Sequence, residues 1–420
     1  MAVNSLFDYF RKPVFVSTLI CILIFYSGFF TIPQKPAVNS LIASKEITAI
    51  SGIILSSPAK TSSGSYYCAS FAPKTVCNAQ GLMSTASGRF TVYIPSEIAE
   101  AFSPGKLFSQ SKSNGFLYET GGQYSFTGRY TDKGFYVKKC KSACWPKSFS
   151  GKLLHFRALC RLHFKRLMYS WGSGGGLLLA LLCGVREYTD TATQDSFRRA
   201  GLSHILALSG MHLSMFSTIA LFLGNRAGIK KLTFFLRIIT LIAFVWFAGF
   251  SPSLTRAFIC AMLMIASAIA GAQKPDMLSI LCFSFLIQSA MCPQDIHSVA
   301  FILSYGALAG ILLTSRFFNR FYYKFCPKIF ASSLSAATGA QTVTAPISLK
   351  IFGAFSPIGI VSSTVVSPFV TIFIYSGLVL ILLSLIFPFL AKPSGIFINL
   401  QYTVITFIVN IFSLVPNWHL

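Results

Sequence analysis

Residues 201–212 read "GLSHILALSGMH" and open an apolar stretch that continues to residue 224. Two histidines, His204 and His212, lie in this stretch with Ser209 and Gly210 between them. Ionisable residues in segments of membrane depth are costly, and they usually face an interior cavity. The alternative is that both histidines pair with backbone carbonyls at a membrane surface. The stretch therefore predicts a membrane protein with an internal polar site.

The composition of the whole chain agrees with a membrane protein. Of 420 residues, 54% are apolar and 11% are charged, against about 25% charged in soluble domains. Runs of about 20 apolar residues, enough to cross a bilayer, recur. We predict a polytopic α-helical fold with about nine spans. The expected spans are 14–32, 232–250, 254–272, 277–292, 297–315, 331–352, 370–388 and 397–416, with a ninth at 167–184 or 204–224.

The loops between these spans predict an orientation. Loops 225–231, 273–276 and 316–328 are basic, whereas turns 251–253 and 293–296 contain no Lys or Arg. The positive-inside rule places basic loops in the cytoplasm. Arg11 and Lys12 place the N-terminus there too. The stretch 14–32 could be a signal peptide, but it is long for one and no A-x-A-like cleavage site follows it, so we expect residues 1–33 to be a retained membrane anchor.

The segment between this anchor and the later spans is strongly basic. Residues 33–170 contain eighteen Lys and Arg against five acidic residues, a net charge of +13. Alternating apolar residues with turns predict a small antiparallel β-barrel of about five strands over residues 34–150, outside the cytoplasm. The positive charge suits a polyanion such as nucleic acid, or anionic membrane lipid, or merely keeps the domain solvated.

Aromatic and basic residues alternate in this β domain, as in proteins that stack on bases and neutralise phosphates. The competing interpretation is that the aromatic residues fill the barrel core. Four cysteines are possible disulfide partners if the domain faces an oxidising compartment, and their spacing matches zinc sites poorly. The candidate DNA contacts are Tyr124, Phe126, Arg129, Tyr130, Lys133, Lys138 and Lys139, and the cysteines are Cys68, Cys77, Cys140 and Cys144.

Two features follow the β domain along the chain. Residues 151–171 predict a basic amphipathic helix on the membrane surface, with Arg157 and Arg161 opposite its apolar side. Residues 172–420 then form the polytopic domain. Because the chain must cross once between residues 170 and 225, only one of the two candidate segments there can be a full span. The other is expected to be re-entrant or broken, as backbone beside a cavity or pathway can be.

The stretch "FRRAGLSHILALSGMHL" (197–213) resembles the signature of the ComEC-type competence proteins, channels that admit transforming DNA through the bacterial inner membrane. Further similarities follow in order at 251–262, 300–311 and 345–369. The resemblance implies uptake of single-stranded DNA through a bacterial inner membrane, with an extracytoplasmic DNA receptor as a partner. It also implies that the β domain at 34–150 is an OB-like barrel, because the family has such a barrel at this place. The expected pathway residues are Arg198, Arg199, Gly201, His204, Ser209, Gly210, His212 and Arg256.

The sequence also predicts what the protein does not do. Many family members continue into a C-terminal metallo-hydrolase-like domain, and no His-x-His-x-Asp-His pattern occurs here, so we expect a short form without nuclease activity, metal or cofactor. No G-x-x-x-x-G-K-[ST] loop occurs, so we expect a cytosolic DNA-pulling ATPase as a partner. Two alternatives remain: an intramembrane hydrolase using Ser209 and His212, and a transporter of another anion.

Overall fold

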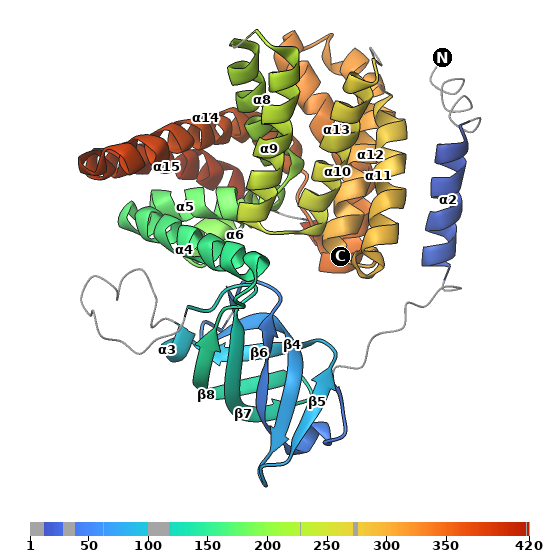
Figure 1. Ribbon diagram of the computed structural model, residues 1–420. Helices are drawn as coiled ribbons and strands as arrows, with labels where there is room; N and C mark the ends of the chain where they lie inside the picture. Colours follow the sequence, from blue (N-terminus) through green and yellow to red (C-terminus); the bar gives the residue numbers. More distant parts are fainter. Residues whose placement is uncertain are drawn as a thin grey trace. The chain divides into compact units, whose positions relative to one another are not determined.

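The computed structural model describes residues 12–27, 38–61, 63–99, 117–226, 228–271, 276–416 and 418–419. Contacts divide the chain into two units. The helical unit comprises Met1–Ile32 and Gly176–Leu420, and the β unit comprises Pro33–Gly175 (Figure 1). Arg11 and Lys274, which we expected to mark cytoplasmic segments, lie outside the described residues.

The β unit is built on one antiparallel sheet with a single parallel pair. Its main strands are β2 (Ile47–Ile54), β4 (Tyr66–Asn78), β6 (Phe90–Pro95), β7 (Gln123–Thr131) and β8 (Gly134–Cys144). Neighbouring strands pair in the order β4-β2-β7-β8-β6, and β6 pairs again with β4, so the path returns to its start. The pair β6–β8 is parallel. The short elements are β1 (Asn39–Ser40), η1 (Ser44–Glu46), β3 (Ala59–Lys60), β5 (Met83–Ser87) and α3 (Ser96–Ala99).

Alternating residues of these strands form the core of the β unit. Phe71, Phe126 and Phe135 are completely buried, and each such side chain stabilises the fold by about 1.5–3 kcal/mol. The predicted hairpin at residues 131–134 is confirmed, because Thr131 pairs with Gly134. Gly134 has a φ of 138°, and a Cβ there would overlap the carbonyl oxygen of Thr91. Only glycine fits that turn.

The predicted amphipathic helix is α4 (Phe149–Ser170). Ser148 caps it by accepting a hydrogen bond from the Gly151 amide, at 3.2 Å. The helix groups with the strands as part of the β unit. Arg157 and Arg161 are buried. The expected position of both opposite the apolar side of the helix does not account for this burial, which follows from the nearby carboxylate of Glu119.

The helical unit contains twelve helices in its described residues, counting α5, which begins at the boundary between the units. The helices α8 to α13 form a bundle, and the long helices α14 and α15 pack together beside it (Figure 1). The helices are α2 (Pro13–Tyr26), α5 (Gly172–Cys183), α6 (Thr191–Arg199), α7 (Ser203–Leu206), α8 (Gly210–Arg226), α9 (Lys230–Ala248), α10 (Pro252–Ile269), α11 (Met277–Met291), α12 (Val299–Tyr322), α13 (Lys328–Phe352), α14 (Gly359–Ile386) and α15 (Ala391–Ser413). Shorter pieces are η3 (Pro293–Asp295), η4 (Pro388–Leu390) and the pair β9 (Ala354–Phe355) and β10 (Trp418–His419).

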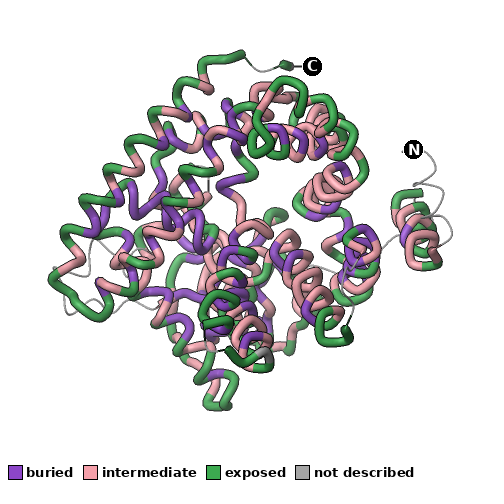
Figure 2. Tube along the Cα trace, turned by 90° about the horizontal axis from the view of Figure 1, so that it is seen from above, coloured by how far each residue is buried: buried purple, intermediate pink, exposed green. Residues whose placement is uncertain are grey.

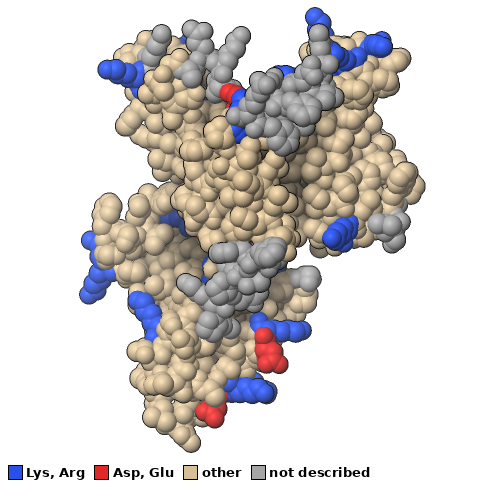
Figure 3. All heavy atoms as spheres, turned by 90° about the vertical axis from the view of Figure 1, so that its right-hand side faces the viewer, with Lys and Arg blue, Asp and Glu red and all other residues tan. Residues whose placement is uncertain are grey.

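Five of the described helical segments are long and apolar enough to cross a membrane: Lys231–Ala248, Pro252–Ile269, Val299–Tyr322, Gly359–Ile386 and Pro388–Ser413. Helices α2, α5 and α11 are apolar but shorter. The expected count of about nine spans is therefore not confirmed. Buried residues gather where helices face one another (Figure 2). On the face in Figure 3, uncharged side chains cover the middle of the helical unit and Lys and Arg lie toward its ends.

The segment 331–352, for which we expected either a polar pore wall or close helix packing, lies in α13. A Cβ on Gly310 of α12 would overlap the carbonyl oxygen of Gly339 in α13. The backbones of α12 and α13 therefore approach as closely as glycine permits, the arrangement typical of small residues between membrane helices. On this face of α13, close packing is the interpretation that holds.

Both ends of α2 are tied to distant parts of the helical unit. Lys12 forms an ion pair of 2.5 Å with Asp276, which precedes α11. At the other end, the hydroxyl of Tyr26 donates to the carbonyl oxygen of Ile296, which follows α11, at 2.7 Å. Helices α2 and α11 therefore run side by side over the same depth.

Candidate functional site

The helical path is interrupted between α7 and α8. Helix α7 ends at Leu206, and Ala207 has an extended backbone with φ −84° and ψ 139°. The next helix begins only at Gly210. The predicted break is present, so His204 and His212 do not share the face of one continuous helix. Irregular backbone at membrane depth needs protein or water to satisfy its polar groups.

Ser209 and His212 meet across this break. The backbone amide of Ser209 donates to His212 Nδ1 at 3.2 Å, and the Ser209 Oγ lies 3.3 Å from the same nitrogen. Because Nδ1 accepts from a backbone amide, it carries no proton in this arrangement. A neutral imidazole then carries its proton on Nε2, a tautomer assigned from the hydrogen bond.

The other nitrogen of His212 lacks a partner. The side chain is completely buried, and among the described residues no group hydrogen-bonds to Nε2. A buried donor left unsatisfied costs about 1–3 kcal/mol. Such a group in a native protein calls for an explanation, and donation to a ligand is one. The ring is therefore held through Nδ1 with its donor unused.

Arg256, on the first turn of α10, lies next to the start of α8. Its Nη2 is 3.5 Å from the position that a Cβ on Gly210 would occupy, so glycine leaves room for the guanidinium. Nη1 donates to the carbonyl oxygen of Ser304, and the group lies 5.9 Å from the centre of the Tyr305 ring. Among the described residues, Nε has no partner. Arg256 is thus fixed by α12 and partly unsatisfied.

A buried polar network continues from Tyr305 through the bundle. The Tyr305 hydroxyl donates to Gln288 Oε1 at 2.9 Å, and Gln288 Nε2 donates to the carbonyl oxygen of Pro252 at 3.1 Å. Ser284 lies 3.4 Å from the same hydroxyl. We did not predict this network from the sequence. Gln288 lies inside the expected span 277–292, and a polar residue there indicates a buried hydrogen-bond partner. A second missed polar residue is Arg237 in α9, which donates to Ser217 of α8 at 3.1 Å.

Gly201 ends α6 with φ 74°, and Leu202 donates from its amide to the Phe197 carbonyl oxygen at 2.8 Å. This is a glycine-terminated helix end of the Schellman type. A Cβ on Gly201 would lie 2.8 Å from the Cα of Gly359, at the start of α14. Ser362 adds a hydrogen bond of 2.7 Å to the carbonyl oxygen of Ala200. Gly201 therefore packs this turn against α14.

The structure brings only part of the predicted pathway set together. Ser209, Gly210, His212 and Arg256 meet at the start of α8. His204 on α7 is exposed, and so are Arg198 and Arg199 at the end of α6. We continue below with the first four residues, which we call the α8 cluster.

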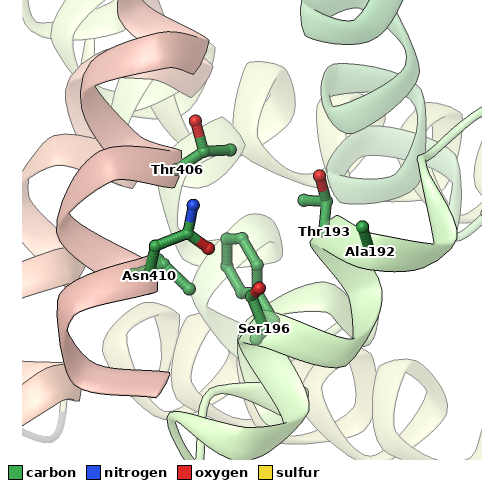
Figure 4. A pocket seen from close by; sticks show the side chains of 7 residues that line it. Ala192, Thr193, Ser196, Thr406 and Asn410 are labelled. Atoms are coloured by element: carbon green, nitrogen blue, oxygen red, sulfur yellow. The ribbon is translucent and has the colours of Figure 1, made fainter. Parts of the chain in front are cut away.

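A small pocket of about 80 Å³ lies between α6 and α15 (Figure 4). Its polar lining includes Thr193, Ser196 and Asn410. Thr193 Oγ1 also lies 2.8 Å from the Tyr402 hydroxyl. A water molecule occupies about 30 Å³ of liquid volume, so the pocket suits a few waters at most. None of its lining residues belongs to the α8 cluster.

The β unit divides the predicted DNA contacts into two groups. Tyr124 and Phe126 are 2% and 0% exposed and belong to the core, so they are not placed to stack on bases. For these two, filling the core of the β unit is the correct interpretation, because alternate residues of β7 point inward. Tyr130 packs against the same core and is half-buried. The exposed members are Arg129, Lys133, Lys138 and Lys139.

A buried carboxylate explains the buried arginines of α4. Glu119 is 3% exposed, and its Oε2 lies 3.4 Å from Arg161 Nε. Ser57 donates a hydrogen bond to its Oε1. Burial raises the pKa of Glu119, but Arg161, Lys165, Ser57 and Arg157 together hold that pKa below its usual value. The charged form therefore holds α4 against the sheet.

The four cysteines that we considered as disulfide partners are free thiols in the structure. Cys68 and Cys77 lie nine positions apart on β4, and Cys140 and Cys144 four apart on β8. At about 3.3 Å per residue, both separations exceed the 7 Å that a disulfide can bridge. The expected disulfides are absent from the structure. Among the described residues, no group of three His, Cys, Asp or Glu is placed to hold a metal ion.

Comparison with known proteins identifies the class. The family model described as "Competence protein" matches residues 181–420, so the chain belongs to this family of competence membrane proteins. The chain is 26% identical to ComE operon protein 3 of Bacillus subtilis over 59% of its length, which covers 31% of that protein. It is 26% identical to Recombination protein 2 of Haemophilus influenzae over 46% of its length, which covers 26% of that protein. The chain thus spans less than a third of these relatives, and no solved structure matches it.

Proposed function

We propose that the protein is an inner-membrane channel for single-stranded transforming DNA and that the α8 cluster lines its path. The observation that carries the proposal is the break before α8, where His212 presents an unused buried donor within the part that matches the competence family. Arg256 lies beside it, and a guanidinium can hold phosphate through two parallel hydrogen bonds. In this proposal, His212 and Arg256 donate hydrogen bonds to each phosphate as the strand passes, and among the described residues neither side chain forms an ion pair with a carboxylate.

The contacts of α2 support the proposed orientation. The Lys12–Asp276 ion pair joins the N-terminal segment to the loop before α11, two segments that the positive-inside rule assigns to the cytoplasm. Tyr26 meets Ile296 in a turn without Lys or Arg. The N-terminus is accordingly cytoplasmic and the β unit extracytoplasmic in this proposal.

The strand order of the β unit supports an OB-like barrel. With β2, β4, β6, β7 and β8 counted as strands one to five, the pairing order is 1-2-3-5-4 and closes on strand one, with strands three and five parallel. OB folds are closed or partly open five-stranded barrels that bind oligonucleotides on the face of strands two and three. In this proposal, the basic β unit receives the strand from an extracytoplasmic receptor, and a cytosolic ATPase pulls it inward.

The proposal is tested by DNA uptake. Cells lacking the gene should import no labelled DNA into the cytosol, and the wild-type chain should restore import. His212→Ala at normal protein levels should reduce import at least tenfold, because it removes both the donor and the bond that holds the break. His297→Ala, which removes an exposed histidine of the same unit, is the matched control and should import normally. Normal import without the gene contradicts the proposal.

One observation favours an intramembrane hydrolase as a second candidate, namely the 3.3 Å distance from Ser209 Oγ to His212 Nδ1. A serine nucleophile needs such a base, and the base normally has an orienting partner on its other nitrogen. Among the described residues, Nε2 has no such partner. Covalent labelling of Ser209 by a serine-reactive probe, lost in His212→Ala, would favour the hydrolase over the channel.

A further inference from the structure

Three tyrosines gather on the outer side of the β unit. Tyr93 and Tyr136 stack with ring centres 4.6 Å apart and planes 13° from parallel. Tyr66 stands nearly perpendicular to both, at 6.5 Å from Tyr93 and 5.4 Å from Tyr136. We call these three residues the tyrosine cluster. The sequence analysis did not single out Tyr66 or Tyr93.

The backbone pattern shows that the stacked pair faces away from the core. Tyr93 lies between the buried residues Val92 and Ile94 on β6, and Tyr136 lies between Phe135 and Val137 on β8. Side chains alternate between the two faces of a strand, so Tyr93 and Tyr136 project outward. All three tyrosines are half-buried, whereas core aromatic residues such as Phe135 are buried.

Basic side chains border the tyrosine cluster. Arg129 on β7 is exposed and pairs directly with Tyr136, which in turn pairs with Tyr93. Arg129, Tyr136 and Tyr93 therefore form a row across three neighbouring strands. A register shift on β7 leaves Lys138 outside the paired positions, and it is exposed two residues beyond Tyr136.

We propose that the tyrosine cluster, with Arg129 beside it, is a stacking surface for the bases of single-stranded nucleic acid. Aromatic rings next to positively charged side chains are the combination that binds single-stranded nucleic acid. Every nucleobase has a flat face that can stack on an aromatic ring, and every nucleotide has a phosphate that a basic side chain can neutralise. Tyr66 and Tyr93 lie on β4 and β6, the pair that corresponds to the binding strands of an OB fold. The choice of ligand rests on the proposed function; the position of the surface rests on the rings and charges alone.

The closing experiment compares two ligands of equal charge. The full-length protein in detergent is titrated with a labelled thymidine oligomer and with an abasic oligomer of the same length. The double variant Tyr93→Ala, Tyr136→Ala should lower the affinity for the thymidine oligomer about 5- to 150-fold, the effect of losing the stacking of one nucleobase. Its affinity for the abasic oligomer should be unchanged. Tyr93→Phe with Tyr136→Phe should bind both as wild type does, since the rings remain.

Two further variants separate stacking from charge and from fold. Arg129→Gln should weaken both oligomers by a similar factor and lessen the salt dependence of binding. Tyr323→Ala, which removes an exposed tyrosine of the helical unit, should change neither. If the double alanine variant loses protection of the strands in hydrogen exchange, Tyr136→Leu replaces it, because leucine keeps apolar bulk and removes the ring.

The outcomes distinguish this inference from the proposed function. If the wild type binds no oligomer at low salt, or if the alanine variants weaken both oligomers equally, the stacking surface is wrong. Preference of the wild type for vesicles of anionic lipid, with no oligomer bound, also overturns it. Cellular uptake that requires the gene would still support the channel in each case, whereas uptake without the gene would overturn the channel alone.

Discussion

The two units treat their buried polar groups differently. In the β unit, the Glu119 carboxylate is surrounded by Arg161, Ser57 and further basic groups of α4. In the helical unit, Arg256 pairs with no carboxylate among the described residues: its Nη1 donates to the Ser304 carbonyl oxygen, and its guanidinium lies near the Tyr305 ring. Buried nitrogens without a hydrogen-bond partner occur in both units, at His212 Nε2 and at Arg166 Nε, so the difference lies in the counter-charge. A paired charge holds one arrangement of a core, whereas an arginine without a counter-charge can bind an anion. The contrast teaches where to look for structure and where to look for function.

The largest expected effect is the loss of the Glu119 carboxylate. Glu119→Ala leaves Arg161 buried without its counter-charge, which costs about 3–5 kcal/mol of stability. Hydrogen exchange of strands β2, β7 and β8 in the full-length protein measures this loss. Glu97→Ala, at an exposed position on α3, is the control and should change exchange very little. A loss below about 1 kcal/mol would contradict the role given to the ion pair.

The same carboxylate should make the β unit sensitive to acid. The pKa of Glu119 is lowered in the folded state, so its contribution is complete above the unfolded value, about 4.3, and is lost as the pH falls through the folded value. Near neutral pH the contribution is constant. Exchange measured from pH 6 down to about pH 3 should show the loss in wild type and a flatter profile in Glu119→Gln. Equal slopes for both proteins would assign the acid sensitivity to other groups.

The smallest effect is expected in the helical unit, at the network beside Arg256. Tyr305→Phe removes the hydroxyl that donates to Gln288, and should cost about 1 kcal/mol, because hydrogen bonds between membrane helices are individually weak. Thermal unfolding in detergent measures it, with Tyr323→Phe as an exposed control. Should Tyr305→Phe cost as much as Glu119→Ala, the contrast between the units would disappear.

The sequence predicted those features that depend on local pattern. Alternation in β7 and β8 predicted the hairpin. The single crossing required between residues 170 and 225 predicted that one of two segments is broken, and a break lies before α8. It was not used to decide which aromatic residues face inward, although Tyr124 lies between the polar residues Gln123 and Ser125 and Tyr136 lies between the apolar residues Phe135 and Val137. That choice is made by register with β2 and β6.

Contacts between distant segments were beyond the sequence. Nothing in the pattern around Glu119 indicates Arg161, since an ion pair depends on how α4 returns to the sheet. The same holds for Arg256 with Tyr305 and for Gly201 with Gly359. Apolar runs also did not settle the number of spans, because α11, with 15 residues, is apolar but shorter than the five described helices that are long enough to cross a membrane.

The ion pair between Lys12 and Asp276 has a consequence for biosynthesis, because its two residues are 264 positions apart. At about 5–20 residues per second, α2 emerges from the ribosome roughly 10–50 s before its docking partner exists. The contacts that define the β unit lie within Pro33–Gly175 and are synthesised in that interval. Helix α2 therefore exists for that interval without the residues to which it docks, and it can pack against α11 only after α11 has been synthesised.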